Sequence, residues 1–326
     1  MKAQKIEVSH RTIIFAIIFI LALWFVYFIR DILFQLFVAL IIMATLNPLV
    51  TKLHKYKFPR AASVIVVYIF VFGVIGGIFF ALIPPLVTQT TSFVNNLPRL
   101  LDRIGVPFVL SDQVVSQILA QIGTIPSQLV RAVISVFSNV LGVLTVMIFA
   151  FYLLLAREKL DEQLGNFFGK EKKKEIAKMV DLLEMKLGGW ARGQAFLMFL
   201  VGFFTYIGLI LLSIPFSLPL AILAGLLEIV PFIGPILSAI PSVIIGFGIS
   251  PITGMATASL YFLIQQLENY VFVPNVMKRS VGVSPIIVLL ALAIGFRLAG
   301  VLGVFLSVPV VITLQVLIKQ YMLSEK

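Results

Sequence analysis

The chain consists of long uncharged stretches separated by short charged loops. Each stretch is roughly long enough to cross the hydrocarbon core of a bilayer, which takes about 20 helical residues. This pattern predicts an all-α polytopic membrane protein with about eight hydrophobic segments. The uncharged stretches cover residues 12–29, 32–51, 61–98, 132–156, 195–227, 229–267, 280–296 and 298–318.

Two regions near the C-terminus repeat the same unusual order of residues. In residues 218–248 an apolar run is interrupted by Glu228 and the sequence Pro-Phe-Ile-Gly-Pro, and in residues 284–318 by Arg297 and the sequence Gly-Val-Leu-Gly. Broken helices and buried charges are costly in a membrane, so they mark places where something binds or passes. Paired interrupted segments are typical of secondary-transport sites, and each is expected to form a broken or re-entrant helical hairpin.

The distribution of Lys and Arg predicts the orientation of these segments. The basic N-terminus and the basic loop at 51–60 are expected in the cytoplasm, according to the positive-inside rule. The hairpin at 218–248 is then expected to enter from outside and the hairpin at 284–318 from inside. This arrangement keeps Lys278, Arg279 and the C-terminus cytoplasmic and makes the hairpins an inverted-topology pair.

The first half of the chain is expected to form a membrane scaffold over residues 1–156. Its third segment is predicted to end at Pro84-Pro85, because proline removes a backbone donor and disrupts a helix. Residues 86–131 mix polar and apolar positions and are expected to form amphipathic helices outside the membrane.

The most charged stretch, residues 157–192, separates this scaffold from the rest of the chain. Its apolar residues fall at helical spacing, which predicts an amphipathic cytoplasmic helix that ends at Gly188-Gly189. The helix either links two halves or acts as a gate or a subunit-docking element. Residues 193–326, which contain both hairpins, are expected to form the transport unit.

Composition removes several classes of function. Sixty per cent of residues are hydrophobic and the mean hydropathy is +1.11, which excludes a soluble domain. The net charge of +11 is spread over loops beside the spans, so it indicates membrane topology and not nucleic-acid binding. The absence of cysteine excludes disulfides and thiolate metal sites. No nucleotide motif and no catalytic constellation is present, so neither a cofactor nor an enzymatic activity is expected.

Glu228 is the first candidate for chemistry, because it precedes the helix breakers Pro231 and Pro235. Prolines free backbone carbonyls and open helix ends, which can coordinate a cation or a hydroxylated solute. The carboxyl group of Glu228 could bind a cation or a proton. Alternatively, it could be a structural partner of a backbone amide at the break or of an arginine.

A polar patch in the segment at 253–274 is the second candidate. Gln265, Glu268 and Asn269 share a helix face at spacings of three and four. Amide and carboxyl groups together could satisfy several hydroxyls of a polar ligand, or they could bind the broken backbone of the hairpins.

The predicted hairpin tips supply the remaining candidates. Arg297 could neutralise Glu228 if the tips meet, attract an anionic or polyhydroxylated solute, or extend towards water. Gly234 and Gly300 lie where a positive φ angle could be needed.

The chain resembles the AI-2E family transporters, also called the PerM or UPF0118 family. The resemblance rests on Glu-Ile-Val-Pro-Phe-Ile-Gly-Pro at 228–235 and on Gln-Leu-Glu-Asn-Tyr at 266–270, followed by Pro274, Met277 and Lys278, then Ser-Val-Gly at 280–282 and Pro285. It extends in motif detail from Gly193 to the C-terminus.

This resemblance implies a bacterial inner-membrane protein of about eight hydrophobic segments. It also implies export of autoinducer-2 or a similar solute in one branch, sodium(lithium)/proton antiport in another, a homopentameric assembly and an elevator-like movement.

Three functions are therefore open. The leading one is a secondary transporter or exporter of a small polar solute. Its transport could be coupled to the proton gradient through Glu228 or Glu268. The second is a monovalent cation/proton antiporter, and the third is a structural membrane protein with no transported solute. Convergence of Glu228, Glu268 and Arg297 on one polar cavity would favour transport.

Overall fold

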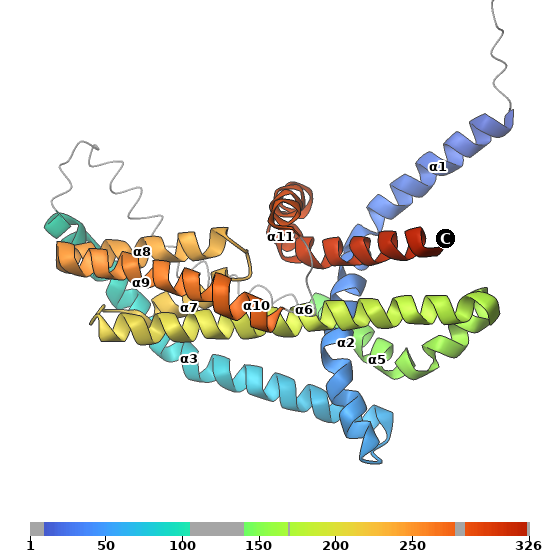
Figure 1. The fold of residues 1–326 in the computed structure, drawn as a ribbon, viewed down its shortest axis with the longest axis horizontal. Coiled ribbons are helices and arrows are strands. Elements are labelled where there is room, and N and C mark those ends of the chain that lie inside the picture. Colours follow the sequence, from blue (N-terminus) through green and yellow to red (C-terminus); the bar gives the residue numbers. More distant parts are fainter. Residues whose placement is uncertain (1–9, 105–139, 169, 278–283, 325–326) are drawn as a thin grey trace, which may run out of the picture.

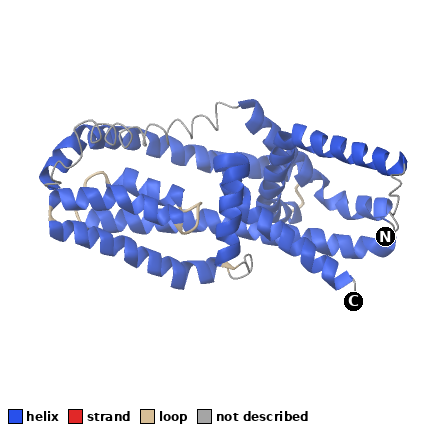
Figure 2. Ribbon diagram, turned by 90° about the horizontal axis from the view of Figure 1, so that it is seen from above, coloured by secondary structure: helices blue, strands red, loops and turns tan. Residues whose placement is uncertain are grey.

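The computed structural model describes residues 10–104, 140–168, 170–277 and 284–324. These residues form helices joined by short turns, with no strand among them (Figures 1 and 2), which confirms the all-α prediction. The helices are α1 His10–Phe28, α2 Arg30–Lys55, α3 Arg60–Ile104, α5 Val140–Phe168, α6 Lys170–Leu211, α7 Ser217–Leu227, α8 Ile233–Ile249, α9 Pro251–Leu267, the π-helix η1 Glu268–Phe272, α10 Val273–Val276 and α11 Pro285–Ser324.

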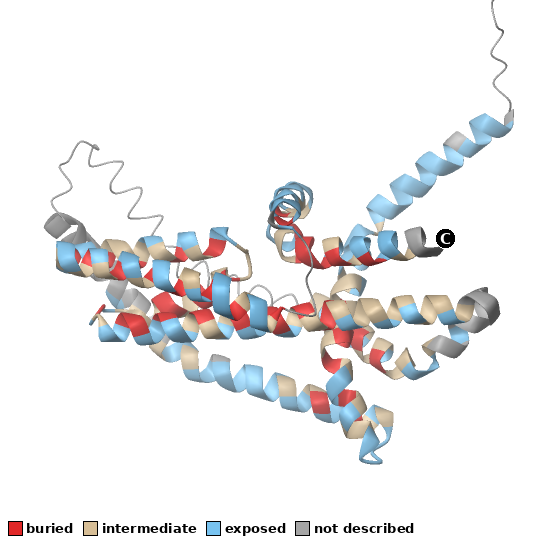
Figure 3. Cartoon of the chain, in the orientation of Figure 1, coloured by how far each residue is buried: buried red, intermediate tan, exposed pale blue. Residues whose placement is uncertain are grey.

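Six of these helices are long and apolar enough to cross a membrane, and two shorter apolar helices accompany them. Their outer faces carry large exposed hydrophobic side chains, most clearly along α1 (Figure 3), and no other described part of the chain covers them. Such surfaces are stable against lipid and not against water. The chain is therefore a multi-pass helical membrane protein.

Helix α6 is the central rod of the molecule (Figure 1). One end packs on α2 and α5, and the other packs on α7 and α9. The prediction that a cytoplasmic helix ends at Gly188-Gly189 is wrong, because α6 continues through both glycines to Leu211. Gly188 instead serves a close helix crossing: a Cβ atom there would lie 2.1 Å from the carbonyl oxygen of Ala44 in α2.

The crossing of α6 and α2 is fixed by a backbone group that proline leaves unpaired. Pro48 lies inside α2 and has no N–H to donate to the carbonyl of Ala44, four residues earlier. Arg192 of α6 supplies the missing donor, with Nη1 3.1 Å from the Ala44 oxygen and 2.9 Å from the Thr45 oxygen. A side chain of α6 therefore supplies the hydrogen-bond donor that Pro48 removes from α2.

Ionic contacts join α5 to the same crossing. Arg157 donates from Nε to Glu184 over 2.5 Å and also pairs with Asp181. Asn47 donates to the other carboxyl oxygen of Glu184, and its own oxygen accepts from Arg60 over 2.7 Å. Side-chain contacts therefore connect α2, α5, α6 and the start of α3 at this crossing.

Helix α3 differs from the sequence prediction at its C-terminal end. The helix does not end at Pro84-Pro85 but continues to Ile104. Pro84 and Pro85 remove only two backbone N–H donors, and the other hydrogen bonds of the helix can still form. Prolines are for this reason tolerated inside membrane helices. The remainder of the external region expected at 86–131 lies outside the described residues from 105 on, as do Lys278 and Arg279.

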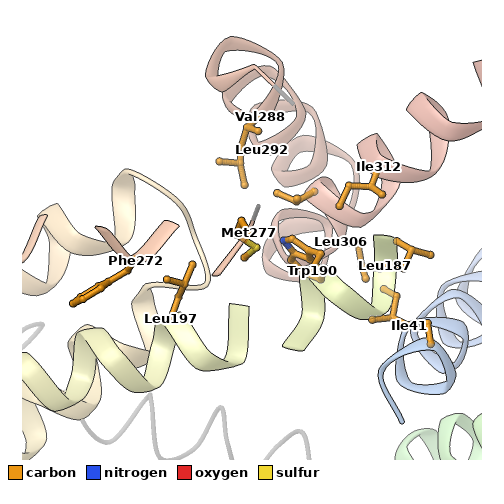
Figure 4. Packing of buried hydrophobic residues seen from close by; sticks show 12 residues of the cluster. Ile41, Leu187, Trp190, Leu197, Phe272, Met277, Val288, Leu292, Leu306 and Ile312 are labelled. Atoms are coloured by element: carbon orange, nitrogen blue, oxygen red, sulfur yellow. The ribbon is translucent and has the colours of Figure 1, made fainter. Parts of the chain in front are cut away.

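The largest apolar cluster holds the C-terminal helix against the rod (Figure 4). The cluster includes Leu292 and Leu306 of α11, Trp190 and Leu197 of α6, and Met277, which follows α10. The second interrupted region therefore packs mainly on α6.

Candidate transport site

The first interrupted region is a helical hairpin with a sharp tip. Helix α7 ends at Leu227 and α8 begins at Ile233. Between them Phe232 adopts φ 68° and ψ −45°, and the amide of Ile233 donates to the carbonyl of Pro231 over 2.8 Å. Because Pro231 has no amide hydrogen, the helix of α7 has no donor with which to continue at that position.

Gly234 is needed at this tip for space and not for its backbone conformation. Its φ angle is not positive, contrary to the expectation, and Phe232 adopts the positive φ instead. A Cβ atom on Gly234 would lie 1.9 Å from the carbonyl oxygen of Leu227. The two arms of the hairpin approach so closely that only glycine fits.

The second interrupted region is broken at Ala299 and Gly300 inside α11. Gly300 has φ 58° and ψ −136°, a conformation that favours glycine, so here the positive φ is present as expected. The two arms pack against each other, because Ser307 donates to the carbonyl of Ala291 over 2.9 Å and a Cβ atom on Gly303 would overlap the Gly295 oxygen.

Glu228 lies at the broken end of α7 and is buried, with 2% of its surface exposed. The side chain of Gln194 in α6 donates from Nε2 to the backbone carbonyl of Glu228 over 2.8 Å. The carboxyl oxygen Oε2 of Glu228 is buried and receives no hydrogen bond from the described donors. A side chain of α6 thus satisfies the backbone carbonyl of Glu228, while one oxygen of its carboxyl group has no hydrogen bond from the described donors.

The nearest acid is Glu268. Glu268 is 6% exposed and stands at the junction of α9 with the π-helix η1. Its carboxyl group lies close enough to that of Glu228 for the two to interact, and it accepts from Nε2 of Gln265 over 3.1 Å. Two acids from separate interrupted elements therefore meet in the interior, and in the described part of the chain no cationic side chain pairs with either.

A hydrogen bond between two carboxyl groups requires a proton on one of them. Two adjacent carboxylates in a medium of low dielectric constant also repel strongly, so double ionisation is unfavourable. The pair can hold one proton and can exchange it for a cation, which makes this geometry capable of coupling.

The other expected site residues lie apart from the acid pair. Arg297 is exposed beside the break in α11 and forms no ion pair within the described ranges, so it does not neutralise Glu228. Asn269 is also exposed. Pro235 lies in the first turn of α8, where its carbonyl accepts from Ser238 over 2.9 Å.

Sequence reasoning missed Gln194 and the π-helix. Gln194 is a polar residue within an apolar helix of the rod, which was the available signal, but its partner is distant in the chain. π-helical turns are rare and often lie at functional sites. The π-helix here begins at Glu268 itself.

A separate cavity of about 270 Å³ lies at the crossing of α2, α5 and α6. It is lined by Ala44, Asn47, Pro48, Arg157, Asp181, Glu184, Met185 and Arg192. Its arginines and acids pair with one another and with backbone carbonyls, as described above, so the cavity belongs to the helix crossing and not to the acid pair.

Comparison with known proteins places this geometry in context. The family model of the AI-2E family transporters matches residues 13–323. The chain is 26% identical over 307 residues to a Bacillus subtilis protein named "Putative transport protein YueF", a match that covers 88% of this chain and 83% of the relative. It is 24% identical over 309 residues to a second B. subtilis protein, "Putative transport protein YrrI", with 90% and 88% covered. A Thermotoga maritima protein named "Putative transport protein" is 21% identical over 272 residues, with 82% and 84% covered.

Proposed function

The chain belongs to the AI-2E transporter family, and we propose that it is a proton-coupled secondary transporter of a small polar solute. The observation that carries the proposal is the contact between the buried carboxyl groups of Glu228 and Glu268. Each acid lies at an irregularity in a helix, and neither has a basic partner among the described residues. Intramembrane acids of this kind usually take part in function.

The acid pair would serve as the coupling site. With one shared proton the pair carries a single negative charge, and a second proton or a cation neutralises it. A neutral site can move through a low-dielectric region at much lower cost than a charged one. Protonation would therefore permit the conformational step, and loss of the proton would reset it.

The helical breaks would provide the solute site and its movement. In this proposal the hairpins at 218–248 and 284–318 are re-entrant and enter from opposite leaflets, as an inverted-topology pair. Residues 193–326 move as the transport unit against a scaffold formed by residues 1–156. The solute is a polyhydroxylated molecule similar to autoinducer-2, which is consistent with the family's name.

The proposed setting is the inner membrane of a bacterium, with both termini in the cytoplasm. The protein would assemble as a homo-oligomer, with a pentamer favoured by the family resemblance. Its exposed apolar helices, such as α1, offer surfaces for lipid or for neighbouring copies.

A monovalent cation is the second candidate substrate. The two carboxyl groups form an oxygen-rich environment, and no guanidinium or ammonium group of the described residues pairs with them. Hard cations prefer such ligands. Sodium(lithium)/proton antiport would use the same pair of acids.

Purified protein in vesicles with an internal pH-sensitive dye tests these proposals. Autoinducer-2, Na⁺ and Li⁺ are added separately, and proton movement is recorded for the wild type, Glu228→Gln and Glu268→Gln. Asp31→Asn is the matched control, because the side chain of Asp31 is 82% exposed in the first turn of α2.

We expect at least one addition to drive proton movement in the wild type and in the control, and neither acid variant to respond. Normal proton movement in both acid variants would remove the pair from the mechanism. Absence of any response in the wild type would favour the structural, non-transporting alternative.

A further inference from the structure

We propose that a polar stripe along α9, where it faces α8, relays protons between the acid pair and the loop at Ser250. This inference rests on the proposed proton coupling and names the route that the proton takes. It assigns a function to hydroxyl side chains outside the acid pair.

The stripe follows one face of α9 from its N-cap to the acid pair. Its members recur every three or four residues, which is the spacing of a single helix face. They are Ser250, Thr253, Thr257, Tyr261, Gln265 and Glu268. This face packs against α8, since α8 and α9 form one of the most extensive helix contacts in the protein.

Hydroxyl groups along the stripe are already in contact with one another. The Oγ atom of Ser242 in α8 lies 2.7 Å from Oη of Tyr261, and both residues are buried. The Oγ atom of Ser250 lies 2.8 Å from Oγ1 of Thr253. In both pairs either oxygen can donate, so the direction of the hydrogen bond can reverse, as a relay requires.

Thr257 occupies the space between these two hydroxyl pairs. Its hydroxyl group donates to the carbonyl of Thr253 over 2.8 Å and faces Gly246 of α8, where a Cβ atom would lie 2.7 Å from the hydroxyl oxygen. Glycine at this position leaves room for the threonine hydroxyl. Rotation of that hydroxyl, or a bridging water, would connect the pair at Ser250 with the pair at Tyr261.

The same antiparallel register leads to the acids. Ser242 lies opposite Tyr261, so the next turn towards the hairpin tip brings Ser238 to the level of Gln265. Ser238 is 1% exposed, and Gln265 donates to Glu268. The stripe therefore ends at the carboxyl group whose neighbour, Glu228, has a buried and unpartnered oxygen.

The length of α9 explains why a relay is needed. At 1.5 Å per residue, Glu268 lies about 27 Å along the helix from Ser250. Both acids are almost fully buried, and residues 217–272 contain no other charged side chain. A proton entering from the Ser250 end therefore meets no other carboxyl or basic group on α7, α8 or α9.

The relay transfers protons without leaving charge on the stripe. Each hydroxyl oxygen accepts a proton from one neighbour and passes its own proton to the next, so bonds formed and broken balance at every oxygen. The amide of Gln265 cannot pass a proton on, so the hydroxyl group of Ser238, or a bridging water, carries it from Tyr261 to the acid pair. The proton added at the Ser250 end is matched by one that arrives at the acid pair. Gln265 orients the Glu268 carboxyl group by its hydrogen bond.

The test compares variants that remove a hydroxyl but keep the shape of the side chain. Tyr261→Phe and Thr257→Val are reconstituted in vesicles, and proton movement after a pH jump is measured on each side of the membrane separately. The chain has no cysteine, so Ile252→Cys, at an 81% exposed position beside Ser250, reports orientation through an impermeant maleimide.

Matched controls separate the stripe from general effects of hydroxyl removal. Tyr270→Phe removes the hydroxyl of a 75% exposed tyrosine, and Ser259→Ala removes one that donates on an exposed face of α9 to Met255 over 2.9 Å. The melting temperature of every variant is measured in detergent, so that a fold defect is recognised.

We expect both stripe variants to slow proton movement whichever side receives the pH jump, because a proton that crosses in either direction passes along the stripe, and we expect both controls to be unchanged. Equal rates for the stripe variants and the wild type would overturn the relay and leave helix packing as the role of the stripe. Absence of coupled proton movement in the wild type would instead contradict the proposed function, so the two failures are distinguishable.

Discussion

Gln194 of α6 donates to the backbone carbonyl of Glu228 over 2.8 Å and thereby binds the central rod to the broken end of α7. In a continuous helix this carbonyl would accept from the amide of residue 232, but the turn at Pro231 prevents that bond. No other donor to this oxygen is found among the described residues. The side chain from a different helix therefore stabilises the break beside the acid pair.

Gln194→Leu should destabilise the protein, because it leaves a buried carbonyl without a donor. The expected loss is about 1–3 kcal/mol, measured as a lower melting temperature in detergent. Gln266→Leu is the control, since Gln266 makes no hydrogen bond to the described residues. Equal stability of the two variants would show that the contact with Glu228 is dispensable.

Gly188→Ala should disrupt the crossing of α6 and α2. The added methyl group would overlap the backbone oxygen of Ala44, which cannot move without shifting α2. Overpacking of this kind typically costs about 1–3 kcal/mol. Gly73→Ala in α3 meets no atom within 4 Å, and the helix propensity of alanine should raise its stability by up to about 1 kcal/mol. Opposite shifts in melting temperature are expected for the two variants.

Arg192 and Pro48 should show energetic coupling. Arg192→Met removes the donor to the Ala44 carbonyl and is expected to cost about 1–3 kcal/mol in the wild type. Pro48→Ala restores a backbone N–H that can donate to the same carbonyl, so Arg192→Met should then cost less. A double-mutant cycle by chemical denaturation measures the difference. The same cost in both backgrounds would mean that Arg192 does not compensate for the proline.

Gly300→Ala should strain the tip of the second hairpin. The backbone at φ 58° and ψ −136° is outside the regions that alanine adopts easily, and the expected cost is about 1–3 kcal/mol. No side chain lies within 4 Å of the new methyl group, so the effect comes from the backbone alone. Gly76→Ala has equally open surroundings and an ordinary helical φ, and it should not be destabilised in the same thermal measurement.

The sequence by itself determined the class of this protein and the breaks in its two interrupted regions near the C-terminus. Runs of uncharged residues are sufficient for the membrane assignment, since hydrophobic length is a local property of the chain. The breaks at 228–232 and 299–300 follow from proline and glycine for the same reason, because those residues act on their own backbone. Glu228 and Glu268 were identified because a charge within an apolar run is itself the signal.

Only the tertiary structure decided which of these residues meet. Glycines at 188 and 189 suggest a helix end, but the close passage of α2 requires a glycine inside a continuous helix. Arg297 matches Glu228 in sequence position, whereas the acid that meets Glu228 is Glu268, and Arg297 is exposed on α11, which packs on α6. Gln194 acquires its role only through a partner 34 residues away. Such pairings depend on the packing of whole helices, and no local pattern in the sequence contains that information.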